Sequence, residues 1–333
     1  MYAELLDRLA DDIEVGGPTA EILQGHEDDP GPSALALRLL GSVHRLVLER
    51  RAGALGAFYP SVGGTWEPDE GTAAFVALLL REPEAVAEWL DRPPQTNEVG
   101  RAAALMGGLA HLPSWQRGSV RLFEIGSSGG LNLLADRFEY VDDSGRRFGR
   151  RRSSVRLEPA WSAAPLPRSS VRFEHRIGCD TNPVDVSTTE GRLTLTAYVW
   201  PDQAERLERL RGALAVAQDH PPVVRRMGAA DFVERIALSD RATTVLWHSV
   251  MWQYLPEAER DRISVRIQEL GERGEVDGMD FAHLFLEPTR RTPEGDHEFL
   301  VVLTTWPDGE RERRILGHAA PHGIPVTWDR EDT

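Results

Sequence analysis

The chain has 333 residues, of which 41% are hydrophobic, and its formal net charge is −15. This length and apolar content suffice for one large domain with a smaller addition. The acidic balance disfavours nucleic acid and anionic membranes as partners, because like charges repel. The sequence contains no lysine, which excludes Schiff-base chemistry and the lysine of a phosphate-binding P-loop. A single cysteine, Cys179, excludes an internal disulfide and a multi-cysteine zinc site, and we expect no metal site.

No apolar run approaches the ~20 residues that a membrane-spanning helix needs. Residues 1–12 carry acids in an amphipathic pattern instead of the basic and apolar regions of a signal peptide. We therefore expect a cytoplasmic protein that acts on a small-molecule substrate and contacts no membrane. The sequence specifies no oligomeric state.

Residues 1–115 have the apolar periodicity of helices and are interpreted as a helical lid or cap domain. Asn97 is the predicted N-cap of the last helix, with Glu98 in its first turn. Gly-Pro pairs separate the first helices. The expected elements are helices at 5–13, 35–47, 72–80 and 97–109, and a loop at 58–68.

Residues 116–333 alternate between short apolar runs, typical of buried parallel strands, and helical stretches. This alternation predicts an α/β fold with a doubly wound, mostly parallel sheet of the methyltransferase-like Rossmann type. Strands are expected at 121–125, 173–179, 243–247 and 281–286, helices at 131–138, 202–217, 231–238 and 256–272, an extra strand at 193–200, and edge strands at 299–305 and 324–328.

An inserted hairpin is predicted at residues 139–158, around a turn signal at 142–145. Five arginines lie beside this turn: Arg146, Arg147, Arg150, Arg151 and Arg152. A solvated hairpin explains them, and a site for an acidic or phosphate-bearing substrate is the alternative.

The segment 122–134 joins a strand to a helix through a glycine-rich turn. Gly126 can bend the chain with a positive φ, and Gly130 lets the backbone approach a ligand closely. Glu124, two residues before the first glycine, suits a site that receives a cation, such as the amino group of S-adenosylmethionine. A pyrophosphate would be repelled there, so a methyltransferase-like site is preferred to a dinucleotide site. Ser127, Ser128 and Asn132 complete the expected cofactor turn.

Three later segments agree with an adenosyl cofactor. Asp180 ends the next strand, where it can accept the ribose hydroxyls, while Asp231 and Phe232 can flank the adenine. The segment 247–256 follows the fourth strand at the expected substrate mouth. Asp180 lies 50 residues after Gly130 (180 minus 130), whereas the spacing in a dinucleotide-binding fold is ~20 residues. The inserted hairpin explains the longer spacing.

The chain resembles the bacterial family known as domain of unknown function 2332. Ser127 and Gly129 stand where that family's turn more often has alanines. The resemblance implies a methyltransferase-like fold and brings no established reaction. It is carried by residues 97–101, 124–132, 178–185, 200–203 with Arg206, 248–249 and 321–323.

His248, Glu98 and Glu287 are the candidate catalytic residues, since each can take a proton. For His248 and Glu287, a role in hydrogen bonding at a strand end is the alternative. The candidate substrate-binding residues are Asn97, Arg101, Trp200, Asp202, Gln203, Trp252 and Tyr254. An interdomain salt bridge is the alternative for Asn97, Glu98 and Arg101, and core packing for the aromatic residues.

We expect an S-adenosylmethionine-dependent transferase, foremost a methyltransferase, acting on a small polar molecule. A non-catalytic adenosyl-binding or protein-interaction scaffold is the alternative. A second alternative is a hydrolase whose nucleophile is Ser128, because the spacing of Gly126, Ser128 and Gly130 also fits a nucleophile elbow. Its partners would be Asp280 or Glu287 as the acid and His318 or His322 as the base.

Overall fold

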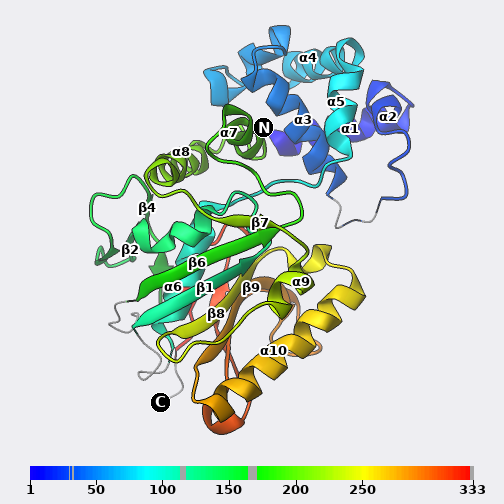
Figure 1. The fold of residues 1–333 in the computed structure, drawn as a ribbon. Coiled ribbons are helices and arrows are strands. Elements are labelled where there is room, and N and C mark those ends of the chain that lie inside the picture. The colour runs from blue at the N-terminus through cyan, green and yellow to red at the C-terminus, as the bar shows by residue number, and fades with distance from the viewer. Residues whose placement is uncertain (30, 32–33, 113–117, 164–170, 331–333) are drawn as a thin grey trace. The chain divides into compact units, whose positions relative to one another are not determined.

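The computed structural model describes residues 1–29, 31, 34–112, 118–163 and 171–330 (Figure 1). The chain forms two compact units, each made of two chain segments. Residues 1–96 and 184–208 form the helical unit, and residues 97–183 and those from 209 onward form the sheet unit. Residues 97–112, expected in the N-terminal helical domain, belong to the sheet unit.

The helical unit contains no strand among its described residues. Apolar side chains at helical spacing build its core, such as Leu5 and Leu9 of α1 and Leu39 and Val43 of α3. The expected loop at 58–68 contains a short 3-10 turn, and two buried tyrosines, Tyr2 and Tyr59, pack edge to face. The elements are α1 (Tyr2–Glu14), α2 (Pro18–Ile22), α3 (Leu35–Leu48), η2 (Gly53–Phe58), η3 (Pro60–Val62), α4 (Pro68–Arg81), α5 (Pro83–Leu90) and α7 (Thr189–Ala197).

The expected strand at 193–200 is wrong, because residues 189–197 form helix α7. The alternation of leucine and threonine in this segment resembles a strand. However, the Thr188 side chain caps the helix by accepting a hydrogen bond from the Gly191 amide at 3.0 Å. The hydroxyls of Thr194 and Thr196 donate to carbonyls one turn earlier, which lets these β-branched residues remain in the helix.

The sheet unit is built on a mixed, mostly parallel sheet of nine strands in the part of the chain that is described. Strands β7, β6, β1, β8 and β9 are parallel, and β9 to β12 continue as an antiparallel meander. The four buried runs predicted as strands lie within β1, β6, β8 and β9. The order is β5 (Trp161–Ser162), β12 (Val326–Trp328), β11 (Glu312–Ala319), β10 (His297–Thr305), β9 (Phe281–Arg290), β8 (Thr243–Ser249), β1 (Ser119–Ile125), β6 (Arg172–Asp180) and β7 (Val224–Arg226).

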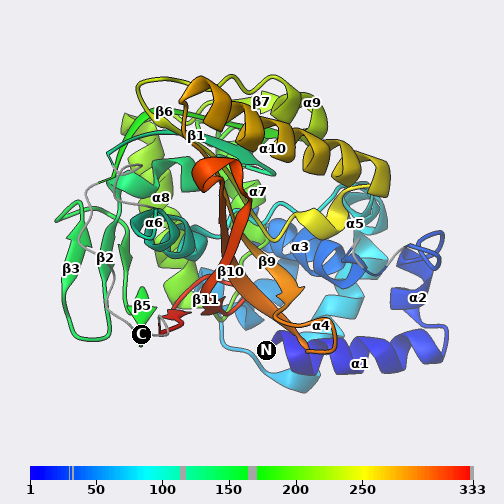
Figure 2. The ribbon, with the colours of Figure 1, turned by 90° about the horizontal axis from the view of Figure 1, so that it is seen from below.

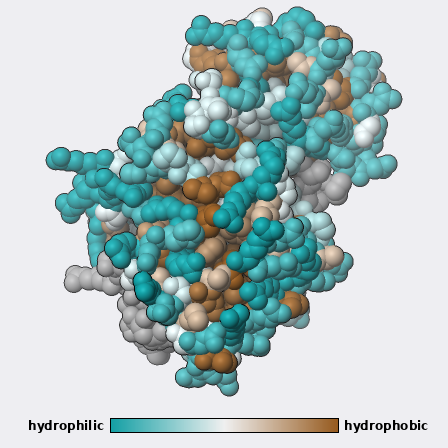
Figure 3. All heavy atoms as spheres, viewed as in Figure 1, coloured by the Kyte–Doolittle hydropathy of each residue, from teal (hydrophilic) through white to brown (hydrophobic). Residues whose placement is uncertain are grey.

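Helices cover both faces of this sheet (Figures 1 and 2). On one face, α9 (Ala229–Glu234) and α10 (Glu257–Asp277) enclose an apolar cluster; α10 buries Ile263, Ile267 and Leu270, which recur at helical spacing. The opposite face packs against α6 (Ala102–Ala110), where Gly108 lies against Leu284. Figure 3 shows the polar outer face of α10 as hydrophilic surface beside apolar atoms over the sheet.

Within residues 139–158, β2 (Glu139–Val141) pairs antiparallel with β3 (Arg147–Gly149), and β4 (Arg156–Leu157) joins them in a small second sheet. Arg147 forms an ion pair with Glu139, and the Arg146 guanidinium lies 4.5 Å from the ring centroid of Phe148. Both contacts belong to a solvated hairpin.

Three helix predictions differ from the structure in their bounds. The segment after Asn97 begins with a 3-10 turn, η4 (Val99–Arg101), before α6, and the helix expected at 131–138 is a 3-10 helix, η6 (Leu131–Arg137). The helix expected from 231 is α9, which ends at Glu234. The remaining helix, α8 (Ala204–Asp219), follows its apolar pattern.

Candidate functional site

The strand order of the parallel sheet reverses at β1. The chain adds β6 and β7 on one side of β1 and then returns to add β8 and β9 on the other side. In open α/β sheets, ligands bind beyond the carboxyl ends of the strands at such a reversal. We call this region, formed by the ends of β6, β1, β8 and β9, the carboxyl edge. Asp180, Glu124, His248 and Glu287 all lie there.

The glycine-rich turn leaves β1 in a tight left-handed path. Gly126, Ser128 and Gly130 have φ values of 68°, 52° and 73°. Two backbone hydrogen bonds hold the turn: the Ser127 amide donates to the Cys179 carbonyl of β6 at 3.0 Å, and the Gly130 amide donates to the Ser127 carbonyl at 2.7 Å. The two glycines are therefore required by backbone conformation.

Protein side chains fill the space beside both glycines. A Cβ at Gly126 would lie 2.8 Å from a Met251 carbon, and a Cβ at Gly130 would lie 2.7 Å from a Val224 methyl group. A ligand that binds at this turn would therefore have to approach it from a side that the Met251 and Val224 side chains leave open.

Asp180 contacts the glycine-rich turn although it is distant along the chain. Its carboxylate accepts the Ser128 amide and the Asn182 amide, both at 2.8 Å. Each carboxylate oxygen has a second lone pair. Asp180 is half-buried, so these lone pairs remain available to a ligand hydroxyl.

Glu124 is buried at the end of β1, with 3% of its surface exposed. Its Oε2 atom accepts no hydrogen bond from the residues that the structure describes. Burial raises the pKa of Glu124 to about 8, and the Asp180 charge adds to this, while Ser127, Trp247 and Arg101 oppose it. The site therefore holds a protonated carboxyl at neutral pH.

Asn97 caps the N-terminus of a different helix from the one predicted. Its side-chain oxygen accepts the Leu131 amide at 2.9 Å, so it caps η6 beside the glycine turn. The Glu98 carboxylate accepts the Gly100 amide at 3.2 Å and begins η4. Asn132 donates to the Glu98 carbonyl at 3.3 Å, and its own side-chain oxygen has no partner among the described residues. These residues join the 97–101 segment to the turn.

Arg101 is buried and connects three chain segments. Its guanidinium donates to the Ser249 carbonyl at 3.3 Å and to the Pro321 carbonyl at 3.1 Å. His322 places Nδ1 at 3.8 Å from the Glu98 carboxylate. Arg101 therefore positions the loops after β8 and β11 at the carboxyl edge.

The structure brings His248 and Glu287 together with a third side chain, His283, for which the sequence predicted no role. The His248 Nδ1 atom lies 2.8 Å from Glu287 Oε1, and its Nε2 atom lies 3.0 Å from His283 Nε2. Trp252 stacks on His248 at 5.1 Å. His283 lies inside an apolar run of β9, so only the register of β9 against β8 could have revealed it.

Other predicted site residues lie elsewhere in the sheet unit. Asp231 is exposed on α9 and forms an ion pair with Arg262 at 2.8 Å. Phe232 is buried and packs against Phe123. Tyr254 is 45% exposed.

Trp200, Asp202 and Gln203 belong to the helical unit. Trp200 packs against Tyr2 at 5.4 Å, and Asp202 lies 3.2 Å from the amino group of Met1. Gln203 accepts a hydrogen bond from Arg206. Their contacts are those of a structural core and its rim.

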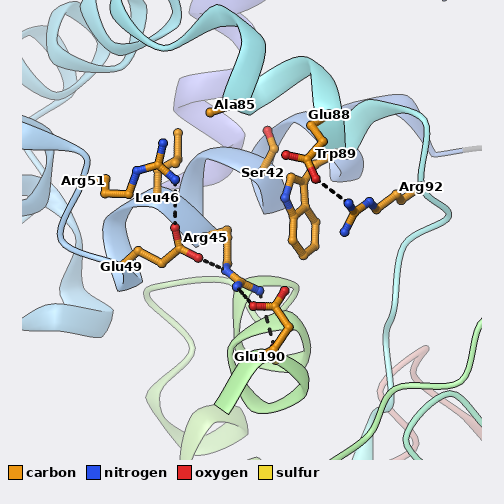
Figure 4. Close-up of a pocket in the computed structure, with 10 residues that line it drawn as sticks. All are labelled: Ser42, Arg45, Leu46, Glu49, Arg51, Ala85, Glu88, Trp89, Arg92 and Glu190. Atoms are coloured by element: carbon orange, nitrogen blue, oxygen red, sulfur yellow. Dashed lines mark hydrogen bonds and ion pairs between the residues drawn. The ribbon is translucent and has the colours of Figure 1, made fainter. Parts of the chain in front are cut away.

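The helical unit contains a pocket of about 200 Å³ between α3, α5 and α7 (Figure 4). Its lining is rich in paired charges: Arg45 lies between Glu49 and Glu190, and Arg92 is directed to Glu88. The two guanidinium groups lie 5.0 and 4.8 Å from the centroid of the Trp89 ring. Because its positive and negative charges are paired, the lining of the pocket is an ion-pair network that links α7 to α3.

Among the described residues, no group of three or more acidic, histidine or cysteine side chains is placed to hold a metal ion. None of the described helices is long and apolar enough to cross a membrane.

A comparison with curated proteins found no similar sequence. A family model described as "Uncharacterized protein conserved in bacteria (DUF2332)" matches residues 1–328. The match covers both units, including the glycine turn, Asp180, His248 and Glu287. The chain therefore belongs to the bacterial family DUF2332.

Proposed function

We propose that the sheet unit is an S-adenosylmethionine-dependent transferase, foremost a methyltransferase, acting on a small polar molecule. The observation that carries this proposal is the reversal of strand order at the glycine turn. The parallel strands run third, second, first, fourth and fifth in chain order, as in doubly wound nucleotide-binding folds. The antiparallel meander from β9 to β12 is a variation at the far edge of the sheet.

Two carboxyl groups at the carboxyl edge fit the adenosyl cofactor. Glu124 Oε2 would accept the cofactor's ammonium group, which would give a partner to a buried atom that has none among the described residues. The free lone pairs of Asp180 would accept the ribose hydroxyls. When bound, the cofactor supplies an electrophilic methyl group.

The other residues of the carboxyl edge would serve the substrate. Glu98 is a buried acid that can accept a proton from the nucleophile, and His248, oriented by Glu287, is the other candidate base. Arg101 would hold the surrounding loops in place and so keep the reacting groups aligned. Alignment matters most, because methyl transfer depends mainly on positioning.

Calorimetry with S-adenosylhomocysteine tests this proposal. We expect binding that weakens by about 10- to 100-fold in Asp180→Ala, because the ribose hydroxyls lose a charged acceptor. Asp231→Ala is the matched control, since Asp231 pairs with Arg262 on the surface, and it should bind as the parent does. Affinity should rise by up to tenfold per pH unit up to about pH 8, because the ammonium must displace the Glu124 proton. Absence of binding at millimolar ligand would favour the non-catalytic scaffold.

One observation favours a second candidate, a hydrolase with Ser128 as nucleophile. Ser128 has a φ of 52°, which resembles the strained nucleophile of a strand–turn–helix elbow. The strand order argues against a hydrolase: several strands precede the nucleophile elbow in hydrolases, whereas β1 is the first strand of the described chain. Labelling by a fluorophosphonate probe that disappears in Ser128→Ala would establish the hydrolase. Unchanged S-adenosylhomocysteine binding by Ser128→Ala, with no labelling of the parent, would support the transferase.

A further inference from the structure

Three buried side chains on β8 and β9 form a continuous hydrogen-bonded chain. Glu287 Oε1 lies 2.8 Å from His248 Nδ1, and His248 Nε2 lies 3.0 Å from His283 Nε2. All three residues are less than a tenth exposed. In parallel strands, His248 pairs with Phe285 and Leu246 with His283, so the three side chains share one face of the sheet.

The Glu287 end of the chain fixes which nitrogen of His248 carries a proton. Glu287 Oε1 also accepts the amides of Met251 and Trp252, at 3.1 and 3.3 Å. These donors favour a carboxylate, which accepts hydrogen bonds and donates none. His248 must therefore donate through Nδ1, so its Nδ1 carries a proton in every state of the chain.

The two Nε2 atoms must then share a single proton. Two N–H groups cannot face each other at 3.0 Å, so one Nε2 donates and the other accepts. When both rings are neutral, His283 donates to the unprotonated Nε2 of His248. When His248 is an imidazolium, its Nε2 donates, and His283 must carry its own proton on Nδ1.

The surroundings decide where a positive charge resides. Burial, the neighbouring His248 and the guanidinium groups of Arg311 and Arg313 hold the pKa of His283 well below its usual range. His248 has the Glu287 carboxylate beside it and lies stacked on Trp252. The charge is therefore more stable on His248 than on His283.

We propose that Glu287, His248 and His283 form a proton relay, in which a proton that enters at His283 Nδ1 produces an imidazolium at His248. In this step an N–H bond forms at His283 Nδ1, and the N–H bond at His283 Nε2 breaks. The released proton forms an N–H bond at His248 Nε2. His283 ends neutral with its proton moved from Nε2 to Nδ1, Glu287 stays a carboxylate, and the chain has gained one proton. His283 is a positioning residue in this relay, and the relay makes His248 a buried base near the end of β8.

Nitrogen-15 NMR of the histidine side chains, recorded from pH 5 to pH 9, tests the relay in the protein without ligand. Variants of His248 and His283 assign their signals among the ten histidines. We expect His248 to gain its proton on Nε2 at the same midpoint at which the His283 proton moves from Nε2 to Nδ1. His283 should not become doubly protonated in this range.

Two variants separate the relay from simple packing. His283→Gln keeps a side-chain oxygen that can accept from His248 Nε2, so His248 should still take up its proton. His283→Phe removes the acceptor, and the midpoint for His248 should fall by about one pH unit or more. Phe285→Leu is the control: it removes a ring that stacks on His248 at 5.3 Å but no proton acceptor, and it should leave the midpoint nearly unchanged.

Independent midpoints for the two histidines, a doubly protonated His283, or a His248 that stays neutral throughout would overturn the relay. A shift of both Nε2 signals by micromolar zinc would also overturn it, because a metal would then replace the shared proton. These outcomes do not depend on S-adenosylhomocysteine. The transferase proposal can therefore be refuted by calorimetry without affecting the relay, and the relay can be refuted by NMR without affecting the transferase proposal.

Discussion

Glu124 should make the stability of the sheet unit depend on pH, and glutamine at this position should remove that dependence. Burial raises the Glu124 pKa from 4.5 to about 8. Between these values the folded protein holds a proton that the unfolded chain has released. The contribution to stability is therefore complete below about pH 4.5, falls as the pH rises, and is lost above about pH 8. At ~1.36 kcal/mol per pH unit, the loss between pH 5 and pH 8 is about 3.5 kcal/mol.

Urea unfolding of the parent and of Glu124→Gln, at pH 5 and at pH 8, measures this effect. Relative to the parent, the variant should be more stable at pH 8 than at pH 5 by about 3.5 kcal/mol. Glu310→Gln changes an exposed glutamate and should show no such difference. A difference below about 1 kcal/mol, or one of opposite sign, would mean that Glu124 is ionised in the folded protein. The raised pKa, and with it the expected rise of S-adenosylhomocysteine affinity up to about pH 8, would then be refuted.

Three further substitutions, each with its own control, test contacts within the helical unit or within the sheet unit. Arg45→Leu should lower the free energy of unfolding of the helical unit by about 2 kcal/mol, measured by thermal unfolding; this is less than the loss of a fully buried ion pair would cost, because Glu190 is largely exposed. The control Arg51→Leu removes an exposed arginine and should lower it by under 1 kcal/mol. Gly178→Ala places a Cβ 2.0 Å from the Ser127 hydroxyl oxygen and should lower the free energy of unfolding by about 2 kcal/mol or more. Adding Ser127→Gly removes the clash and should recover most of this stability. Asn97→Ala should speed hydrogen exchange at the Leu131 amide and cost about 1 kcal/mol, whereas Asn97→Asp keeps the acceptor and should behave like the parent.

Four of the five parallel strands were predictable because they are continuous apolar runs, whereas the short, largely exposed β7 was not predicted. The runs at 121–125 and 243–247 become the central strands β1 and β8. Strand β11 was not predicted, because its first half is a charged sequence around Arg313 and Arg314 that lacks an apolar pattern. The strand expected at 193–200 failed because capping by Thr188 is a local signal that outweighed the alternation.

The candidate site was predictable only where one residue type implies a chemistry. Glu124 and Asp180 follow buried strands, so their place at the carboxyl edge could be inferred from the sequence. The partners of Asn97 and His248 could not, because they lie 34 and 35 positions away along the chain, at Leu131 and His283. Such pairs depend on strand register and on the path of the chain within the sheet unit, which no local pattern encodes.

The division of the chain into interleaved segments has a consequence for its synthesis. Helices α1 to α5 lie within residues 1–96, but their unit is completed only by residues 184–208, where Glu190 supplies a partner for Arg45. A ribosome adds ~5–20 residues per second, so the first helices must wait several seconds while residues 97–183 are made. During that interval their apolar faces are available to chaperones and to one another. A single cut in the gene yields neither unit whole, and isolating the sheet unit requires joining residue 183 to residue 209.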